Sequence, residues 1–412
     1  MPWDPGPRPT WVQDIIDGRG APFVAAVADA PLTRDVLLDE ARVRTGLGDF
    51  GDDAFVEALD VLLASANDEA RFHVVGRARF RETIVHHLAN RLRLREHVRR
   101  DPGVVDEEIA APLVVTGSPR SGTSILHQLL AQDGRHRAPL AWELWCPTPP
   151  PEPATHATDA RIRLADVDVR MSAWLAPHFD AMHEMSATAP RECIGAQNVS
   201  LRSDDLPGNF RLPSYQAWLD RADMTSAYAW HRLVLQVLQR RMPSRRWVLK
   251  APSHLAALDT LFATYPDAEL VVTHRDPLTM LGSVTSLEAT LYWAHSDGVE
   301  LPEIAREQAD RHARLLDALV TWRDAHPDAR VHDVEYWSFV ADPMRAMDEL
   351  YARIDVPLTG DARDAMAHHA AAKPQGRHGG HRYSFDDLGL RYDETRARFR
   401  RYQERFGVPD DF

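Results

Sequence analysis

The segment from Gly117 to Ser124 is the part of the sequence best suited to bind an anion. It has the glycine spacing of a nucleoside-triphosphate P-loop, with Thr123 at the position where that motif requires lysine. Gly117 and Gly122 allow backbone amides to point inward, and a following helix would add the positive end of its dipole. Arg120 supplies the formal charge and can donate to two oxygens of a phosphate or sulfate. The missing lysine argues against magnesium-dependent phosphoryl transfer.

A second element with anion-binding character follows the apolar run 270–273. Asp276 suits a helix N-cap and Pro277 the first helical position, so Arg275 is expected at the carboxyl end of a strand, where parallel sheets bind ligands. Ser283 follows seven residues after Asp276 and returns to the same helix face. An arginine and a hydroxyl placed in this way predict a site for a terminal phosphate.

In their order along the chain, these motifs resemble the sulfotransferase family that uses 3′-phosphoadenosine 5′-phosphosulfate (PAPS), and in particular its bacterial branch. The resemblance covers roughly residues 110 to 405. It implies a loop that binds the 5′-phosphosulfate, an Arg and Ser pair that binds the 3′-phosphate, an aromatic ring against adenine, and a late basic glycine loop over the nucleotide. Trp337 could stack on adenine as well as Tyr336. The donor-binding residues implied are Gly117, Arg120, Ser121, Gly122, Thr123, Ser124, Arg275, Ser283, Tyr336, Arg377, His378 and Gly379.

Sulfuryl transfer needs in-line geometry, a cation near the leaving oxygen and a general base for the acceptor hydroxyl. Lys250 closes the apolar strand 247–249, and the family has a lysine at the matching strand end; Arg120 is a second cation near the transferred group. Three residues compete for the base. Glu143 is preferred, because two flanking tryptophans would desolvate its carboxylate and raise its pKa. His254 and His183 are the alternatives.

Two other classes of protein share parts of this pattern. A P-loop kinase for small molecules would need a loop lysine or an equivalent and carboxylates for magnesium, and a nucleotide-binding module without catalysis would tolerate loss of Lys250 and Glu143. The presence of both residues favours the enzyme. No metal site is predicted, and the expected acceptor is a small alcohol or phenol.

The elements that must position these residues alternate between strand and helix. Short β-branched runs at 111–116, 247–249, 269–273 and 330–334 predict strands, and helices are expected at 255–263, 278–293, from about 343, and at 393–405. This alternation predicts an α/β fold with a P-loop-type parallel sheet flanked by helices. Residues 1–108 are expected to form an N-terminal helical region, with helices near 36–38, at 55–63 and at 69–98. Residues 109–412 would form the α/β domain, with a helical insertion at 146–245 that carries the acceptor pocket.

Composition narrows the class further. The 412 residues hold 48 Lys and Arg against 61 Asp and Glu, a formal net charge of -13, which argues against a nucleic-acid-binding protein. Two cysteines, Cys146 and Cys193, are too few for a disulfide framework and fit a reducing cytoplasm. We expect neither an export signal nor a membrane span. The sequence predicts no oligomeric state.

Overall fold

A parallel five-stranded sheet forms the centre of the computed structural model, which describes residues 3–182, 186–243, 245–372 and 385–411. Its order is β2-β3-β1-β4-β5, and every neighbouring pair is parallel. The strands are β1 (Leu113–Gly117), β2 (His136–Arg137), β3 (Arg246–Lys250), β4 (Glu269–His274) and β5 (Val331–Glu335). The predicted α/β fold class is therefore confirmed.

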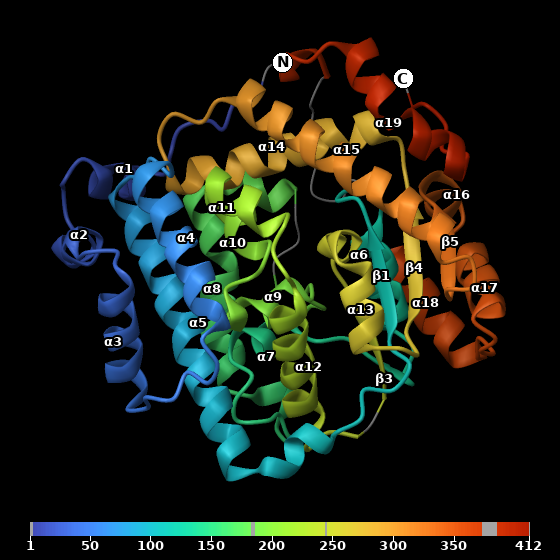
Figure 1. Cartoon of the computed structure of the whole chain (residues 1–412), viewed down its shortest axis with the longest axis horizontal. Helices are drawn as coiled ribbons and strands as arrows, with labels where there is room; N and C mark the ends of the chain where they lie inside the picture. The colour runs from blue at the N-terminus through green and yellow to red at the C-terminus, as the bar shows by residue number, and fades with distance from the viewer. Residues whose placement is uncertain (1–2, 183–185, 244, 373–384, 412) are drawn as a thin grey trace.

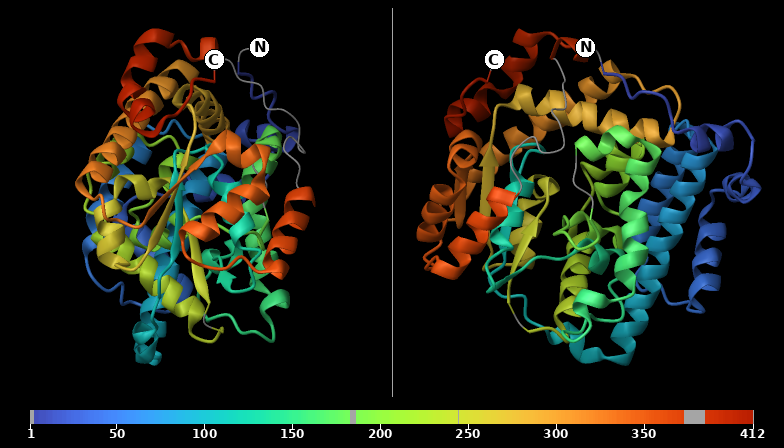
Figure 2. Two further views of the ribbon diagram at one scale, coloured as in Figure 1. Left: turned by 90° about the vertical axis from the view of Figure 1, so that its right-hand side faces the viewer. Right: turned by 180° about the vertical axis from the view of Figure 1, so that it is seen from behind.

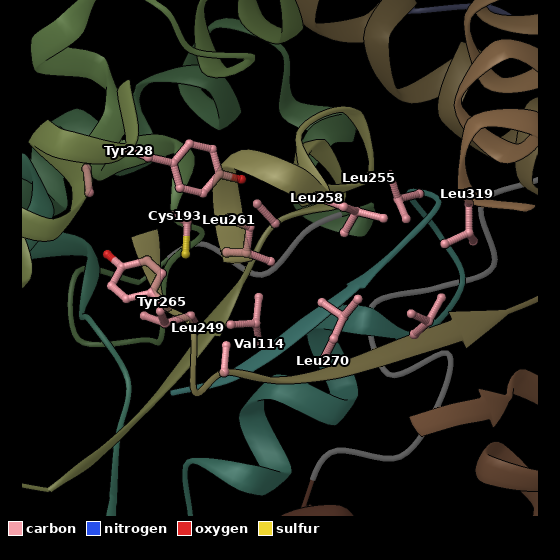
Figure 3. Close-up of a cluster of buried hydrophobic side chains, with 14 of the residues drawn as sticks. Val114, Cys193, Tyr228, Leu249, Leu255, Leu258, Leu261, Tyr265, Leu270 and Leu319 are labelled. Carbon is pink, nitrogen blue, oxygen red and sulfur yellow. The ribbon is translucent and has the colours of Figure 1, made fainter. Parts of the chain in front are cut away.

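Helices cover both faces of the sheet because successive strand residues point to opposite sides. Val114 packs into one layer, under α12 (Thr225–Gln239), α13 (Leu258–Thr264) and α15 (Leu301–Ala325). Its neighbour Val115 packs into the other layer, with α6 (Thr123–Leu130), α17 (Pro343–Arg353) and α18 (Gly360–Ala372). Figure 2 shows the sheet with helices on either side. Figure 3 shows Val114 and Leu270 on the sheet among the leucines of the first layer.

Residues 3–108 are largely helical. Their helices are α1 (Thr10–Ile16), α2 (Pro22–Asp29), α3 (Arg34–Thr45), α4 (Ala54–Asp68) and α5 (Val74–Arg100). They do not bury a core of their own, because Leu59 and Leu88 share one cluster with Leu206 and Tyr215 from the predicted insertion. That insertion contains α8 (Arg161–Leu175), α9 (Ile194–Gln197), α10 (Asp205–Asn209), α11 (Pro213–Leu219) and α12, and the short helix α7 (Ala141–Trp145) lies just before it. The domain boundary at 108 stays a prediction.

A backbone contact joins the N-terminal helices to the α/β part. A Cβ on Gly76, in the first turn of α5, would lie 1.8 Å from the backbone oxygen of His295, which ends α14 (Pro277–His295). The backbone N–H of His73 donates to that same oxygen over 3.3 Å. Glycine is therefore the only residue that permits this approach of α5 to α14.

Several elements differ from the sequence expectations. The long helix α15 was not predicted; it lies beside α14, and the two cross the upper part of the view in Figure 1. The helix expected at 255–263 is split into a 3-10 turn, Pro252–Ala256, and α13. A short helix, α16 (Tyr336–Ala341), was also missed. The closing helix is confirmed as α19 (Tyr392–Phe406).

Candidate active site

The glycine-rich loop connects β1 to α6, as predicted from its spacing. Gly122 caps α6 with a φ of 91°, and a Cβ there would lie 3.0 Å from the ring of Tyr336. The positive φ and the close ring together require glycine at this position. The loop is therefore shaped by its second glycine and packed against the aromatic residue assigned to adenine.

Arg120, Ser283 and Arg275 form one hydrogen-bonded cluster. Arg120 Nε donates to Ser283 Oγ over 3.0 Å, and Arg275 Nη1 donates to the backbone oxygen of Arg120 over 2.8 Å. Arg275 directly follows β4, and Ser283 lies on α14, whose N-terminus is capped by Asp276 with Pro277 at the first helical position. The two predicted anion elements thus meet at the carboxyl ends of the neighbouring strands β1 and β4.

Tyr336 lies against this cluster. The guanidinium of Arg275 lies 4.1 Å from the centre of the Tyr336 ring and 5.4 Å from that of Trp337. Tyr336 is buried, whereas Trp337 is exposed and donates its Nε1 proton to Asp411 Oδ1 over 2.6 Å. Of the two aromatic alternatives, Tyr336 lies directly beside Gly122 of the loop.

The loop hydroxyls differ in what they bind. The Ser121 hydroxyl is fully buried, donates to the Ser118 backbone oxygen over 2.6 Å and lies 2.6 Å from Thr273 Oγ1, so it holds the loop together. Thr123 is buried at the start of α6. Ser124 Oγ instead accepts a hydrogen bond from Lys250 Nζ over 3.1 Å. Ser124 therefore connects the loop to the end of β3.

Lys250 forms an ion pair with Glu192, a residue that the sequence did not suggest. The backbone N–H of Cys193 donates to the Lys250 oxygen over 2.8 Å, which fixes the segment before α9 to the end of β3. Glu192 keeps 24% of its side-chain surface exposed, while Lys250 keeps 4%. The accessible partner of this pair is the carboxylate.

Glu143 has a different environment from the one predicted. Its carboxylate is fully buried and accepts hydrogen bonds from Arg137 Nη2 over 2.7 Å and from the Leu140 backbone N–H over 2.9 Å; His156 Nε2 lies 3.0 Å away. Burial alone would raise the pKa of Glu143, but these partners outweigh it and lower the pKa below its usual value. The predicted rise in pKa was wrong.

His254 is also fully buried. Its Nδ1 lies 2.7 Å from the Tyr228 hydroxyl, and burial lowers its pKa to about 4, so the ring is neutral at neutral pH. The third candidate base, His183, lies outside the described residues, as do Arg377, His378 and Gly379 of the basic glycine loop.

A cavity of about 330 Å³ opens beside these groups. It reaches Ser118 and Pro119 of the loop, and Glu192 lines it, whereas Glu143 and His254 do not. Its other walls include residues of α5, α7, α8, α9, α10, α14 and α15. The N-terminal helical region therefore supplies one wall of the cavity.

No group of three or more potential metal ligands occurs in the described part of the chain. Among the same residues, no helix combines the length and apolar character that crossing a membrane requires.

Comparison with known proteins identifies relatives of this chain. Residues 112–360 match the family model described as "Sulfotransferase family". The crystal structure of sulfotransferase STF1 from Mycobacterium tuberculosis superimposes with a TM-score of 0.79 at 34% identity, over 89% of this chain and 98% of that one. Sulfotransferase STF9 from Mycobacterium avium superimposes with a TM-score of 0.84 at 29% identity, over 92% of this chain and 98% of that one.

A more distant relative has a named acceptor. The omega-hydroxy-beta-dihydromenaquinone-9 sulfotransferase Stf3 of Mycobacterium bovis is 23% identical over 59% of this chain. The match spans 62% of the length of that relative, and the same figures hold for its counterpart in Mycobacterium tuberculosis.

Proposed function

This chain belongs to the sulfotransferase family, as the sequence motifs predicted, and from that premise we propose that it transfers a sulfuryl group from PAPS to a hydroxyl of a small, partly apolar acceptor. The observation that carries the proposal is the cluster of Arg120, Ser283 and Arg275 at the carboxyl ends of β1 and β4. Two guanidinium groups held in one hydrogen-bond network are stabilised when anionic groups bind beside them. A nucleotide with phosphates at both ends of its ribose would meet that requirement.

The donor is divided between the two anion elements. Arg275 and Ser283 bind the 3′-phosphate, and Tyr336 packs against the adenine. Arg120, Ser124 and the loop amides bind the 5′-phosphosulfate, helped by the N-terminal end of α6. The loop glycines contribute by allowing backbone N–H groups to point at the donor. The buried Ser121 hydroxyl is not available for this, because it already forms hydrogen bonds inside the loop.

The transfer step requires Lys250 and a carboxylate. As the acceptor oxygen attacks sulfur, the bond between sulfur and the bridging phosphate oxygen breaks, and 3′-phosphoadenosine 5′-phosphate (PAP) leaves with the electron pair. Lys250 stabilises the charge that develops on that oxygen, with Arg120 as a second cation. The acceptor proton moves to a carboxylate within hydrogen-bond reach.

We assign that carboxylate to Glu192 ahead of Glu143. Glu192 lines the cavity and contacts Lys250, so an acceptor in the cavity can reach it. Glu143 would have to give up its bond to Arg137 before it could serve as the base, and the buried His254 would have to become accessible. The sequence-based choice of Glu143 stays a prediction that paired variants can test.

The acceptor class is an alcohol or phenol with apolar surface. Leu144, Trp145, Leu287 and Leu291 line the cavity together with polar groups. The name of the mycobacterial Stf3 describes a hydroxylated menaquinone derivative, which is also an apolar molecule with a hydroxyl. The lining supports an acceptor with an apolar body, and the name of the relative supports a hydroxyl as the group that is sulfated.

The decisive experiment compares nucleotides and then measures turnover. We expect PAP to raise the Tm of the protein by much more than ATP with magnesium does. We also expect PAPS to be consumed in the presence of a panel of alcohols and phenols, with the acceptor gaining the mass of one sulfuryl group. Stabilisation by ATP with magnesium and phosphoryl transfer would instead identify a kinase. Tight PAP binding without turnover of any panel member would favour a nucleotide-binding module.

A further inference from the structure

The end of the cavity between α14 and α15 contains a second group of polar side chains that the transfer chemistry does not use. Glu288 projects from α14, and His312 projects from α15 one turn after Gln308; Glu288 and His312 both line the cavity. Gln308 links them, because its Nε2 donates to Glu288 Oε2 over 2.5 Å and its backbone oxygen lies 2.9 Å from His312 Nδ1. The two cavity groups are therefore held in a fixed relation.

His312 offers an unused hydrogen-bond acceptor. The residue is 4% exposed, and its contact with the Gln308 backbone oxygen requires the proton on Nδ1. Burial lowers the pKa of His312 to about 4, so Nε2 carries no proton at neutral pH. Nε2 has no hydrogen-bond partner among the described residues. A buried acceptor of this kind costs stability unless a donor reaches it.

Glu288 offers the complementary donor. No cation lies within 4 Å of it in the described part of the chain, since the nearby Arg311 pairs with Asp204 at 2.7 Å and Asp220 at 3.1 Å. Burial raises the pKa of Glu288 to about 8, so the carboxyl group is protonated at neutral pH. The Tyr292 hydroxyl donates to the Pro207 backbone oxygen over 2.8 Å and lies 3.4 Å from Glu288 Oε2. With Oε2 occupied, the carboxyl proton on Oε1 is available to the cavity.

We propose that Glu288 and His312 form a second subsite of the acceptor cavity, which binds an uncharged hydroxyl group of the acceptor at a position remote from the hydroxyl that is sulfated. A hydroxyl accepts one hydrogen bond and donates one, which matches a carboxylic acid beside a bare imidazole nitrogen. Leu287, Leu291 and Leu315 line the cavity around the pair. The arginines of the cavity lining in the described part of the chain are each paired with an aspartate: Arg79 with Asp168, Arg191 with Asp205 and Arg311 with Asp204. A carboxylate or phosphate of the acceptor would therefore be desolvated there without an unpaired cation to compensate. The preferred acceptor is therefore a diol or a hydroxylated phenol with an apolar body. This inference rests on the proposed function, because it takes the cavity as the acceptor site.

The test uses naphthol, its methoxy derivative, the corresponding naphthalenediol and a hydroxynaphthoate as probes, with PAPS as donor. We expect kcat/KM for the diol to exceed that for naphthol by roughly tenfold, the worth of two neutral hydrogen bonds, with the methoxy compound between them and the naphthoate poorest. Glu288→Leu and His312→Phe should each bring the diol to naphthol ratio close to one. Glu288→Gln should retain most of the preference, because an amide still donates.

Controls separate this subsite from the proposed reaction. Glu303→Gln removes a carboxylate of α15 that does not line the cavity and should leave the diol to naphthol ratio unchanged. Calorimetric titration of the four probes into the PAP complex measures the same preference without turnover, and PAP affinity should be the same in all variants. Equal binding of naphthol and diol, or a diol preference that survives both Glu288→Leu and His312→Phe, overturns the subsite alone. Failure of the unmodified protein to consume PAPS with any probe overturns the proposed function and this inference with it.

Discussion

The Nε proton of Arg120 is donated to the Ser283 hydroxyl over 3.0 Å, although the two residues lie 163 positions apart in the chain. Ser283 belongs to the element assigned to the 3′-phosphate, and Arg120 belongs to the loop assigned to the phosphosulfate. The side chains for the two ends of the donor are therefore in direct contact. A substitution in one of these elements should therefore change how tightly the other element binds its end of the donor.

Arg275→Ala should weaken binding of PAP far more than binding of adenosine 5′-phosphosulfate. The reason is that a charge-assisted hydrogen bond to phosphate, worth about 1.5 to 3 kcal/mol, is lost only for the ligand that has a 3′-phosphate. Calorimetric titration of both nucleotides measures the difference. Arg353→Ala, at the exposed end of α17, is the matched control. Equal losses for both ligands would refute the assignment.

Glu192→Gln should lower kcat by roughly 10² to 10⁴ while PAP affinity is retained, because the amide cannot accept the acceptor proton. Single-turnover kinetics with a weakly acidic alcohol measure the step directly. Near-normal turnover in this variant, together with loss of activity in Glu143→Gln, would return the role of base to Glu143.

Glu143→Gln should lower the free energy of unfolding of the protein and have a smaller effect on kcat. Removing one charge from a buried ion pair costs about 3 kcal/mol, because Arg137 is left without its partner. Urea unfolding at neutral pH measures the loss. Glu152→Gln breaks an exposed pair with Arg241 and should cost much less. An unchanged midpoint for Glu143→Gln would contradict the structural role.

Stability should fall as the pH rises through the range in which Glu288 ionises. The folded carboxyl has a pKa of about 8 against 4.5 when unfolded, so between these values the folded state binds more protons than the unfolded state. Raising the pH from about 5 to about 8 therefore costs stability in the native protein, and the loss levels off above that. Glu288→Gln should remove this part of the slope in urea unfolding, and Glu303→Gln should not. Parallel slopes for the native protein and Glu288→Gln would show that the carboxyl is ionised throughout.

Activity should persist in excess chelator. In the proposed reaction Arg120, Lys250 and the loop amides would cover the charge on the donor, so no added cation should be needed. A rate assay with and without chelator, followed by addition of magnesium, checks this. A strict requirement for magnesium would shift the interpretation towards a kinase.

The parts of the site that could be predicted are local in sequence. The loop and the pair of Arg275 and Ser283 each lie within one strand, turn and helix unit, so spacing alone places their side chains. Glu192 could not be found in this way, since it reaches the site through a contact with Lys250 that is 58 positions away and belongs to no motif.

Two errors have different physical causes. The tryptophans around Glu143 correctly suggested desolvation, but the sequence did not show that Arg137 and His156 would bind the carboxylate. The helix α15 was missed although its buried residues Ile304, Gln308 and Leu319 follow a helical period, so that signal was present in the sequence.

The contact of Gly76 with the His295 backbone bears on how relatives of this protein could diverge. Because two backbones already touch there, α5 cannot move closer to α14, and any residue larger than glycine would force the two helices apart. The backbone contact thus sets the smallest possible spacing between these two cavity walls. A new acceptor preference would therefore have to come from substitutions of cavity side chains such as Thr83, His87 and Leu287. The positions of the helices that carry them would stay the same.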